Sequence, residues 1–279
     1  MLKKLLKSLL RIILLSYVGL IGVLYFMQDN LLFYPRPIEN DILKWARNTF
    51  PIAETTLRNT DGEILHGWFV QRHLREKKPL ILYFGGNAEE ITNFLYFYGE
   101  HFPQYAIATF NYRGYGLSEG KPSEKNLFQD ALFLYDYLSK QSTIDPQRIY
   151  VMGRSLGTGV ATYLSSQRQL KGTILISPYD SIVAVAQYHY PFMPMHILLE
   201  HPFESFKYAS QIKTPALAFV GLEDDIIPAL YSQRLIDQWK GEIKKVTFPS
   251  ADHNSIMDEP LLWKSIEEFI SVAAKERRD

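Results

Sequence analysis

A Gly-x-Ser-x-Gly motif near the middle of the chain constrains its fold more than any other feature. The motif runs from Gly153 to Gly157 and has Ser155 at its centre. An apolar run precedes it and a stretch compatible with a helix follows it. This order predicts a nucleophile elbow, a sharp turn that lifts a serine hydroxyl above the edge of a sheet. The two glycines remove side chains where strand and helix crowd together. We therefore expect Ser155 to be a nucleophile.

Continuous apolar runs alternate with amphipathic stretches along the rest of the chain. The runs predict buried strands at 64–70, 79–84, 105–110, 148–152, 172–177, 215–221 and 243–248. Helical spacing of apolar residues appears between most of them, and Pro260 begins a final helix. Buried strands that alternate with helices indicate an α/β fold with a mostly parallel sheet and helices on both faces. Ligands bind such a sheet at the carboxyl ends of its strands.

Residues 1–29 are predicted to form a membrane anchor. Within them, Ile12 to Gln28 carries no charge, and these seventeen residues make ~26 Å of helix, at the short end for a span. Four basic residues precede this segment: Lys3, Lys4, Lys7 and Arg11. The positive-inside rule then predicts a single-pass protein with a cytoplasmic N-terminus and residues 30–279 on the periplasmic, lumenal or extracellular side. A cleaved signal peptide and a core or interfacial helix are the alternative interpretations.

Composition argues against several other classes of protein. The formal net charge is zero, and the 26 basic and 30 acidic residues beyond the basic N-terminus leave residues 12–279 at −4. No strong positive field attracts nucleic acid, so we expect no nucleic-acid partner. The absence of cysteine excludes disulfides, thiol chemistry and cysteine-ligated metals. We expect neither a metal nor a cofactor, and the sequence leaves the oligomeric state open.

The stretch from 181 to 213 interrupts the alternation of strands and helices. It contains no clear strand but many large apolar residues, including Tyr188, Tyr190 and Phe192. Such an insertion over the strand ends is typical of a small cap that faces the substrate. Ordinary core packing of these residues is the alternative interpretation, and the two do not exclude each other.

A serine nucleophile in this architecture is followed along the chain by an acid and then by a histidine. His253 alone among the seven histidines follows the 215–221 strand, and its place after the last strand lets its ring reach the sheet edge. The loop before it offers three carboxylates, Glu223, Asp224 and Asp225, of which the first turn favours Asp224. Asp180 is a further candidate for the acid. The remaining histidines are expected to be structural or solvated: 66, 73, 101, 189, 196 and 201.

The oxyanion of an acyl-transfer reaction needs two N–H donors. One is expected from the backbone of Leu156, the residue after the nucleophile. The other is expected from the loop that follows the 79–84 strand, where the backbone of Asn87 succeeds two glycines. Those glycines are also compatible with a tight turn and nothing more.

Taken together, these motifs resemble the α/β-hydrolase superfamily over roughly residues 30 to 270. Within it the chain looks like a membrane-anchored branch that includes lysophospholipase-like and protein-depalmitoylase-like serine hydrolases. Five features carry the resemblance: Asn30-Leu-Leu-Phe-Tyr-Pro35 after the anchor, Tyr83-Phe-Gly-Gly-Asn-Ala88, Asn111-Tyr-Arg-Gly-Tyr-Gly-Leu-Ser-Glu-Gly120, Gly153 to Gly157, and Gly221-x-x-Asp224-x-x-Ile227-Pro228 with the late His253. The Asn-Tyr-Arg-Gly-Tyr-Gly run is the most specific of these.

The resemblance implies an α/β-hydrolase fold and a Ser155–His253–Asp224 triad, and its Gly-x-x-Asp pattern selects Asp224 as the acid. The chain departs from the family at one point, because Gly85-Gly86-Asn87 stands where the family usually has His-Gly-Asn. This change alters the side-chain packing behind the oxyanion loop and keeps the backbone donor.

The sequence thus predicts a membrane-anchored serine hydrolase that cleaves acyl esters or thioesters of a small-molecule or lipid-like substrate through an acyl-enzyme. An acyl peptidase with the same triad and an acyltransferase that excludes water are alternatives on the same scaffold. A non-catalytic, membrane-bound binding protein is a third alternative, but a binding protein has no need of Ser, Asp and His in matched places.

Overall fold

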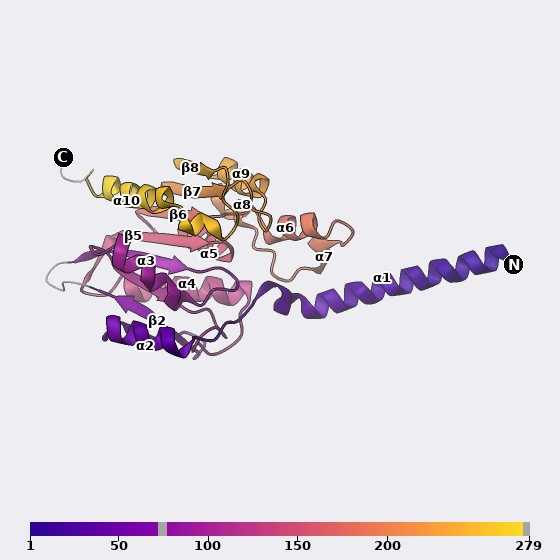
Figure 1. Ribbon diagram of the computed structural model, residues 1–279, viewed down its shortest axis with the longest axis horizontal. Coiled ribbons are helices and arrows are strands. Elements are labelled where there is room, and N and C mark those ends of the chain that lie inside the picture. Colours follow the sequence, from indigo (N-terminus) through magenta and orange to yellow (C-terminus); the bar gives the residue numbers. More distant parts are fainter. Residues whose placement is uncertain (72–76, 276–279) are drawn as a thin grey trace.

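An eight-stranded sheet lies at the centre of the protein (Figure 1), as seen in a computed structural model that describes residues 1–71 and 77–275. The strand order is β1-β2-β4-β3-β5-β6-β7-β8. Of these strands β2 alone runs against the others, because it pairs antiparallel with both β1 and β4 while the remaining pairs are parallel. The strands are β1 (Glu54–Arg58), β2 (Ile64–Val70), β3 (Lys78–Phe84), β4 (Ala106–Phe110), β5 (Ile144–Arg154), β6 (Gly172–Ile176), β7 (Ala216–Gly221) and β8 (Ile243–Phe248).

Helices cover both faces of this sheet, and each face has its own apolar core. Successive residues of β3 show the division, since Leu80 and Leu82 pack into one core while Ile81 and Tyr83 pack into the other. The Leu80 side is covered by α4 (Glu124–Leu138), α5 (Leu156–Gln167), α8 (Ser205–Ala209) and α9 (Ala229–Gln238). The opposite side is covered by α2 (Asn40–Thr49), η1 (Ile91–Asn93), α3 (Phe94–His101) and α10 (Pro260–Lys275). The predicted α/β class with a mostly parallel sheet is confirmed.

The N-terminal helix α1 (Leu2–Leu32) extends away from the sheet (Figure 1). It is longer than the uncharged segment 12–28 because its lysines and leucines are good helix formers. Nearly all of its side chains are exposed, and its length and apolar composition are sufficient to cross a membrane. The segment 181–213 forms α6 (Ile182–His189), α7 (Met195–Leu198) and α8, of which α6 and α7 project from the sheet on the side of α1 (Figure 1).

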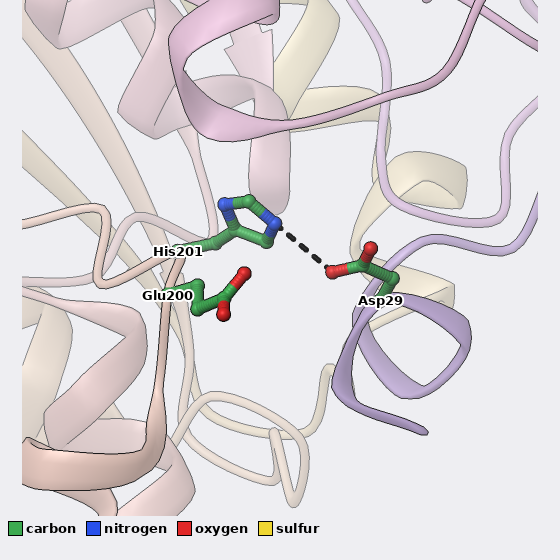
Figure 2. Close-up of side chains that lie close together, drawn as sticks. All are labelled: Asp29, Glu200 and His201. Carbon is green, nitrogen blue, oxygen red and sulfur yellow. Dashed lines mark hydrogen bonds and ion pairs between the residues drawn. The ribbon is translucent and has the colours of Figure 1, made fainter. Parts of the chain in front are cut away.

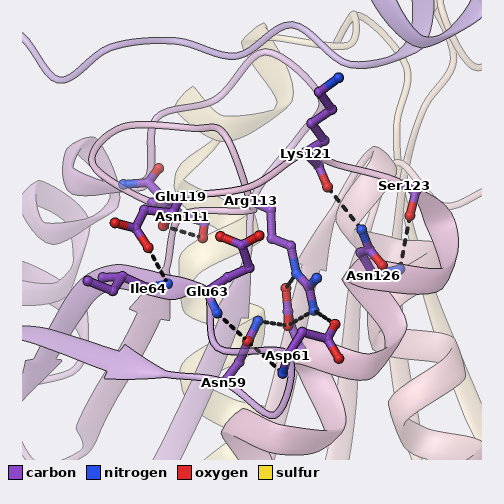
Figure 3. A network of polar contacts seen from close by, with 12 residues as sticks. Asn59, Asp61, Glu63, Ile64, Asn111, Arg113, Glu119, Lys121, Ser123 and Asn126 are labelled. Atoms are coloured by element: carbon purple, nitrogen blue, oxygen red, sulfur yellow. Dashed lines mark hydrogen bonds and ion pairs between the residues drawn. The ribbon is translucent and has the colours of Figure 1, made fainter.

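The loop after β4 contains the Asn-Tyr-Arg-Gly-Tyr-Gly run and is held by a buried ionic network (Figure 3). Arg113 is 4 % exposed and donates two hydrogen bonds of 2.8 Å to the carboxylate of Asp130 on α4. Its Nη2, which makes one of these bonds, also forms an ion pair of 2.8 Å with Asp61 in the β1–β2 turn. Asn59 donates a further hydrogen bond to Asp130. Because the carboxylates neutralise the buried guanidinium, the network fixes this loop against both the turn and α4.

Candidate active site

Ser155 occupies a strained turn between β5 and α5. Its backbone angles are φ 50° and ψ −121°, a region that side-chain-bearing residues rarely adopt. The flanking glycines make the turn possible. A Cβ on Gly153 would lie 2.3 Å from the carbonyl oxygen of Gly157, and a Cβ on Gly157 would lie 2.1 Å from that of Phe84. The predicted elbow is therefore present, and it brings Ser155 to the carboxyl end of the central strand.

His253 links Ser155 to Asp224 by two hydrogen bonds. Its Nε2 lies 2.9 Å from Ser155 Oγ, and its Nδ1 lies 2.7 Å from Asp224 Oδ2. The second carboxylate oxygen of Asp224 accepts the backbone N–H groups of Ile226 and Ile227 at 3.0 and 2.7 Å. All three polar side chains are buried. This geometry lets the imidazole accept a proton from the hydroxyl while the carboxylate orients the ring.

The other candidate acids lie elsewhere. Glu223 and Asp225 are exposed on the loop after β7. Asp180 accepts a hydrogen bond of 2.6 Å from the backbone N–H of Ser181 and lies 3.8 Å from Arg234. Among the carboxylates that the structure describes, Asp224 alone contacts the ring of His253.

In the loop after β3, the backbone N–H of Asn87 has no hydrogen-bond acceptor among the described residues. Gly86 donates its N–H to Glu89 Oε2 at 2.9 Å, so that amide is occupied. The N–H groups of Asn87 and Leu156 have no hydrogen-bond acceptor within the described parts of the chain. Asn87 is held by its other polar groups, since its carbonyl accepts the N–H of Tyr34 at 3.1 Å and its Nδ2 donates to the carbonyl of Leu32 at 3.1 Å.

Two tyrosines of the Asn-Tyr-Arg-Gly-Tyr-Gly run support this loop from behind. Tyr112 donates its hydroxyl to the carbonyl of Gly85 at 2.8 Å, and Tyr115 donates to the carbonyl of Asn87 at 2.6 Å. Burial raises the pKa of both phenols, which keeps them protonated as donors. The run therefore contributes to the site through the geometry of the loop, a role that its sequence alone does not reveal.

Glu89 and Arg154 form a bridge that the sequence analysis missed. Arg154 Nη1 lies 3.2 Å from Glu89 Oε2, and its Nη2 donates to the carbonyl of His253 and to Asn254 Oδ1 at 3.3 and 2.9 Å. Glu89 also accepts the hydroxyl of Tyr83 at 2.7 Å. A Cβ on Gly85 would lie only 3.1 Å from the Glu89 carboxyl carbon. Glu89 thus packs closely against the position where the family usually has histidine.

A cavity of about 410 Å³ opens beside these groups. Ser155, His253, Asn87, Arg154 and Ile226 are among its lining residues. The four other histidines with described partners are bonded to Glu54, Glu267, the carbonyl of Ile226 and Asp29, and none of them lines the cavity: His66, His101, His189 and His201. His73 lies outside the described residues.

Comparison with known proteins places this fold and motif set in a family. Residues 105–271 match the sequence model of the prolyl oligopeptidase family. An uncharacterized membrane protein of Saccharomyces cerevisiae is 30 % identical over 90 % of this chain and 91 % of its own length. The lysophosphatidylserine lipase ABHD12 of Danio rerio is 32 % identical over 61 % of this chain and 49 % of its own length.

A solved structure of low sequence identity shares the fold. The esterase Pf2001 of Pyrococcus furiosus superposes with a TM-score of 0.67 at 19 % identity, over 86 % of this chain and 97 % of that one. The resemblance inferred from the motifs is confirmed. Because the matched family stretch covers more than half of the sequence, this chain belongs to the prolyl oligopeptidase family of α/β-hydrolases.

Proposed function

We propose that this protein is a serine hydrolase that cleaves acyl esters or thioesters through an acyl-enzyme intermediate. The observation that carries the proposal is the pair of hydrogen bonds, 2.9 and 2.7 Å, that joins Ser155 to His253 and His253 to Asp224 at a strained elbow. His253 takes the hydroxyl proton as Ser155 attacks the carbonyl carbon. It then returns that proton to the leaving group, and water activated by the same ring releases the acyl group.

The N–H groups of Leu156 and Asn87 are proposed to bind the oxyanion of the tetrahedral intermediate. Both amides are free of other acceptors in the described chain, and Asn87 is fixed through its carbonyl and its side chain. Fixed donors are effective because they do not need to reorganise when charge develops on the substrate oxygen.

The substrate is proposed to be a lipid-like acyl ester. The lipase among the relatives is named for a lysophospholipid. The cap segment is rich in apolar side chains, and each CH₂ that such a surface buries contributes ~0.8 kcal/mol to binding. An enzyme held at a membrane also meets amphiphiles at high local concentration.

The N-terminal segment, residues 1–29, is proposed to remain as a single-pass anchor with the hydrolase domain, residues 30–279, on the outer side. Support comes from the exposed apolar surface of α1, from the basic residues that precede the uncharged segment, and from the membrane protein among the relatives. The alternative of a cleaved signal peptide predicts a mature chain that begins after this segment.

Labelling by a fluorophosphonate probe tests the nucleophile. The parent should be labelled and Ser155→Ala should not, while turnover falls by ~10⁴–10⁶-fold. Ser165→Ala is the matched control, because Ser165 is also a buried serine and lies on the helix that follows the elbow. Labelling that survives in Ser155→Ala identifies another nucleophile and overturns the assignment.

A substrate panel then separates the ester hydrolase from its rivals. It contains p-nitrophenyl esters of increasing acyl length, a lysophospholipid, an acyl-thioester and an N-acylated peptide anilide. We expect hydrolysis of the esters or thioesters, with activity that rises with acyl length. A preference for acetyl over octanoyl esters would remove the lipid-like substrate, and cleavage of the peptide anilide alone would identify a peptidase.

A further inference from the structure

The cap carries an apolar tip on the same side of the molecule as α1 (Figure 1). The tip comprises the end of α6, the loop 190–194 and α7. Residues 182–199 contain no Asp, Glu, Lys or Arg. Large side chains are exposed on the tip: Tyr188, Tyr190, Phe192 and Ile197. Exposed apolar surface of this kind marks a place where a protein meets another apolar phase.

The tip lies along the anchor helix rather than apart from it. Tyr17 of α1 donates its hydroxyl to the carbonyl of Phe192 at 2.6 Å. Further toward the sheet, Glu200 donates its backbone N–H to Gln28 Oε1 at 2.7 Å and accepts the hydroxyl of Tyr25. The cap therefore follows α1 from residue 28 back to residue 17, a distance of ~16 Å along the helix.

The uncharged part of α1 and the uncharged part of the cap end at the same position along the axis of α1. Asp29 is the first charged residue after the uncharged part of α1, and Glu200 is the first after the uncharged part of the cap. These two side chains and His201 lie together, and one carboxylate oxygen or ring nitrogen of each lies within 4.8 Å of those of the others (Figure 2). His201 Nε2 is 3.0 Å from Asp29 Oδ1. The cluster marks one polar boundary that the helix and the cap share.

We propose that residues 182–199 insert into the outer leaflet of the membrane beside α1, where their side chains contact the acyl chains of the lipids. Phe192 lies beside Tyr17, ~18 Å along the helix from Asp29. If Asp29 sits in the headgroup layer, which is ~6 Å thick, the tip reaches ~12 Å into a leaflet whose hydrocarbon is ~15 Å deep. Charged side chains are costly at that depth, and residues 182–199 contain no Asp, Glu, Lys or Arg.

One contact connects the tip to a residue that lines the active-site cavity. The ring of His189 at the end of α6 lies 2.9 Å from the carbonyl of Ile226, and Ile226 lines that cavity. A smaller cavity of about 160 Å³ lies between α1 and the cap, with apolar walls that include Leu24 and Leu198. The proposal rests on the membrane span proposed above.

Depth measurement with a spin label tests this arrangement without any need for activity. The chain has no cysteine, so single cysteines can be introduced and labelled in the full-length protein in phosphatidylcholine–phosphatidylglycerol vesicles. Phe192→Cys reports on the tip and Val18→Cys on the anchor. Ile52→Cys is the matched control, because Ile52 is 83 % exposed and Phe192 is 85 % exposed. Unchanged thermal unfolding establishes that each variant folds.

Collision rates with oxygen, which concentrates in hydrocarbon, and with a water-soluble nickel chelate report the depth of each label. The ratio of oxygen to nickel collisions at 192 should approach that at 18 and exceed that at 52 several-fold. A ratio at 192 equal to that at 52, with 18 in hydrocarbon, overturns the insertion and leaves the span intact. Aqueous ratios at all three positions overturn the span and the insertion together, while fluorophosphonate labelling of Ser155 still decides the hydrolase function separately.

Discussion

Removal of one hydroxyl, in Tyr115→Phe, tests whether the Asn-Tyr-Arg-Gly-Tyr-Gly run supports the oxyanion loop. Tyr115 is fully buried, and its hydroxyl donates to the carbonyl of Asn87 at 2.6 Å and accepts the N–H of Tyr34 at 2.9 Å. Its loss leaves the Asn87 carbonyl with one donor, so we expect a stability loss of ~1 kcal/mol. Removal of a whole oxyanion donor costs ~10²–10³ in kcat, and a loosened donor should cost part of that, ~3–30-fold.

The assay compares kcat and KM for p-nitrophenyl butyrate in Tyr115→Phe and Tyr135→Phe. Tyr135 is the matched control, because its hydroxyl donates to the carbonyl of Gln169 at 2.7 Å, away from the cavity. Both variants should unfold at slightly lower temperature, by ~2–4 °C. Only Tyr115→Phe should lose kcat, with KM nearly unchanged, because the oxyanion forms only in the transition state. Equal kcat values in the two variants would refute the supporting role of this tyrosine.

Three further predictions address the acid, the pH dependence of stability and the N-terminal region. Asp224→Asn should lower kcat by ~10⁴, whereas the exposed neighbour change Asp225→Asn should have little effect; similar losses in both would contradict the assignment of the acid. A hydrogen bond from Arg47 lowers the pKa of Glu54 to about 2, so this carboxylate stabilises the fold above its unfolded pKa of ~4.3 and loses that effect as pH falls toward 2. Glu54→Gln should therefore be less stable than the parent by ~1 kcal/mol in urea at pH 7, and this gap should shrink as the pH falls from ~4 toward 2. A gap that does not change with pH would exclude this explanation. Deletion of residues 1–35 should lower kcat more than deletion of the proposed anchor alone, because only the longer deletion removes backbone groups that hold the oxyanion loop; equal kcat values would show that the loop does not depend on them.

The sheet was largely predictable from the sequence because its inner strands are continuous apolar runs. The runs predicted at 172–177 and 215–221 match the inner strands β6 and β7 to within one residue. The edge strand β1 was missed for a physical reason. Glu54–Arg58 contains one buried apolar residue, Leu57, so the segment shows neither a continuous run nor a clear alternation.

The candidate site was predictable to the extent that chain order and local motifs define it. The elbow around Ser155 and the late His253 follow from position along the chain, and Asp224 from its place in the first turn after a strand. The pairing of Arg154 with Glu89, 65 positions apart, was not predictable, because no motif and no rule of chain order links these two residues. The sequence places Arg154 at a variable position of the motif, and only the folded chain shows that it reaches the loop of His253.

Hydrogen bonds join the end of α1, the proposed anchor, to the loop that carries Asn87, the proposed oxyanion donor. The carbonyl of Leu32, the last residue of α1, accepts a hydrogen bond from the side-chain amide of Asn87. The backbone N–H of Tyr34 donates to the carbonyl of Asn87. Phe33 between them is 2 % exposed. A tether that served only to localise an enzyme would be expected to reach it through a flexible, solvated linker. Here α1 ends at Leu32 and Tyr34 already contacts the loop that carries Asn87, so the proposed membrane boundary at Asp29 would stand at a fixed height from Ser155. A fixed height favours substrates whose ester group lies at a constant depth, which is the property of a lipid in a leaflet.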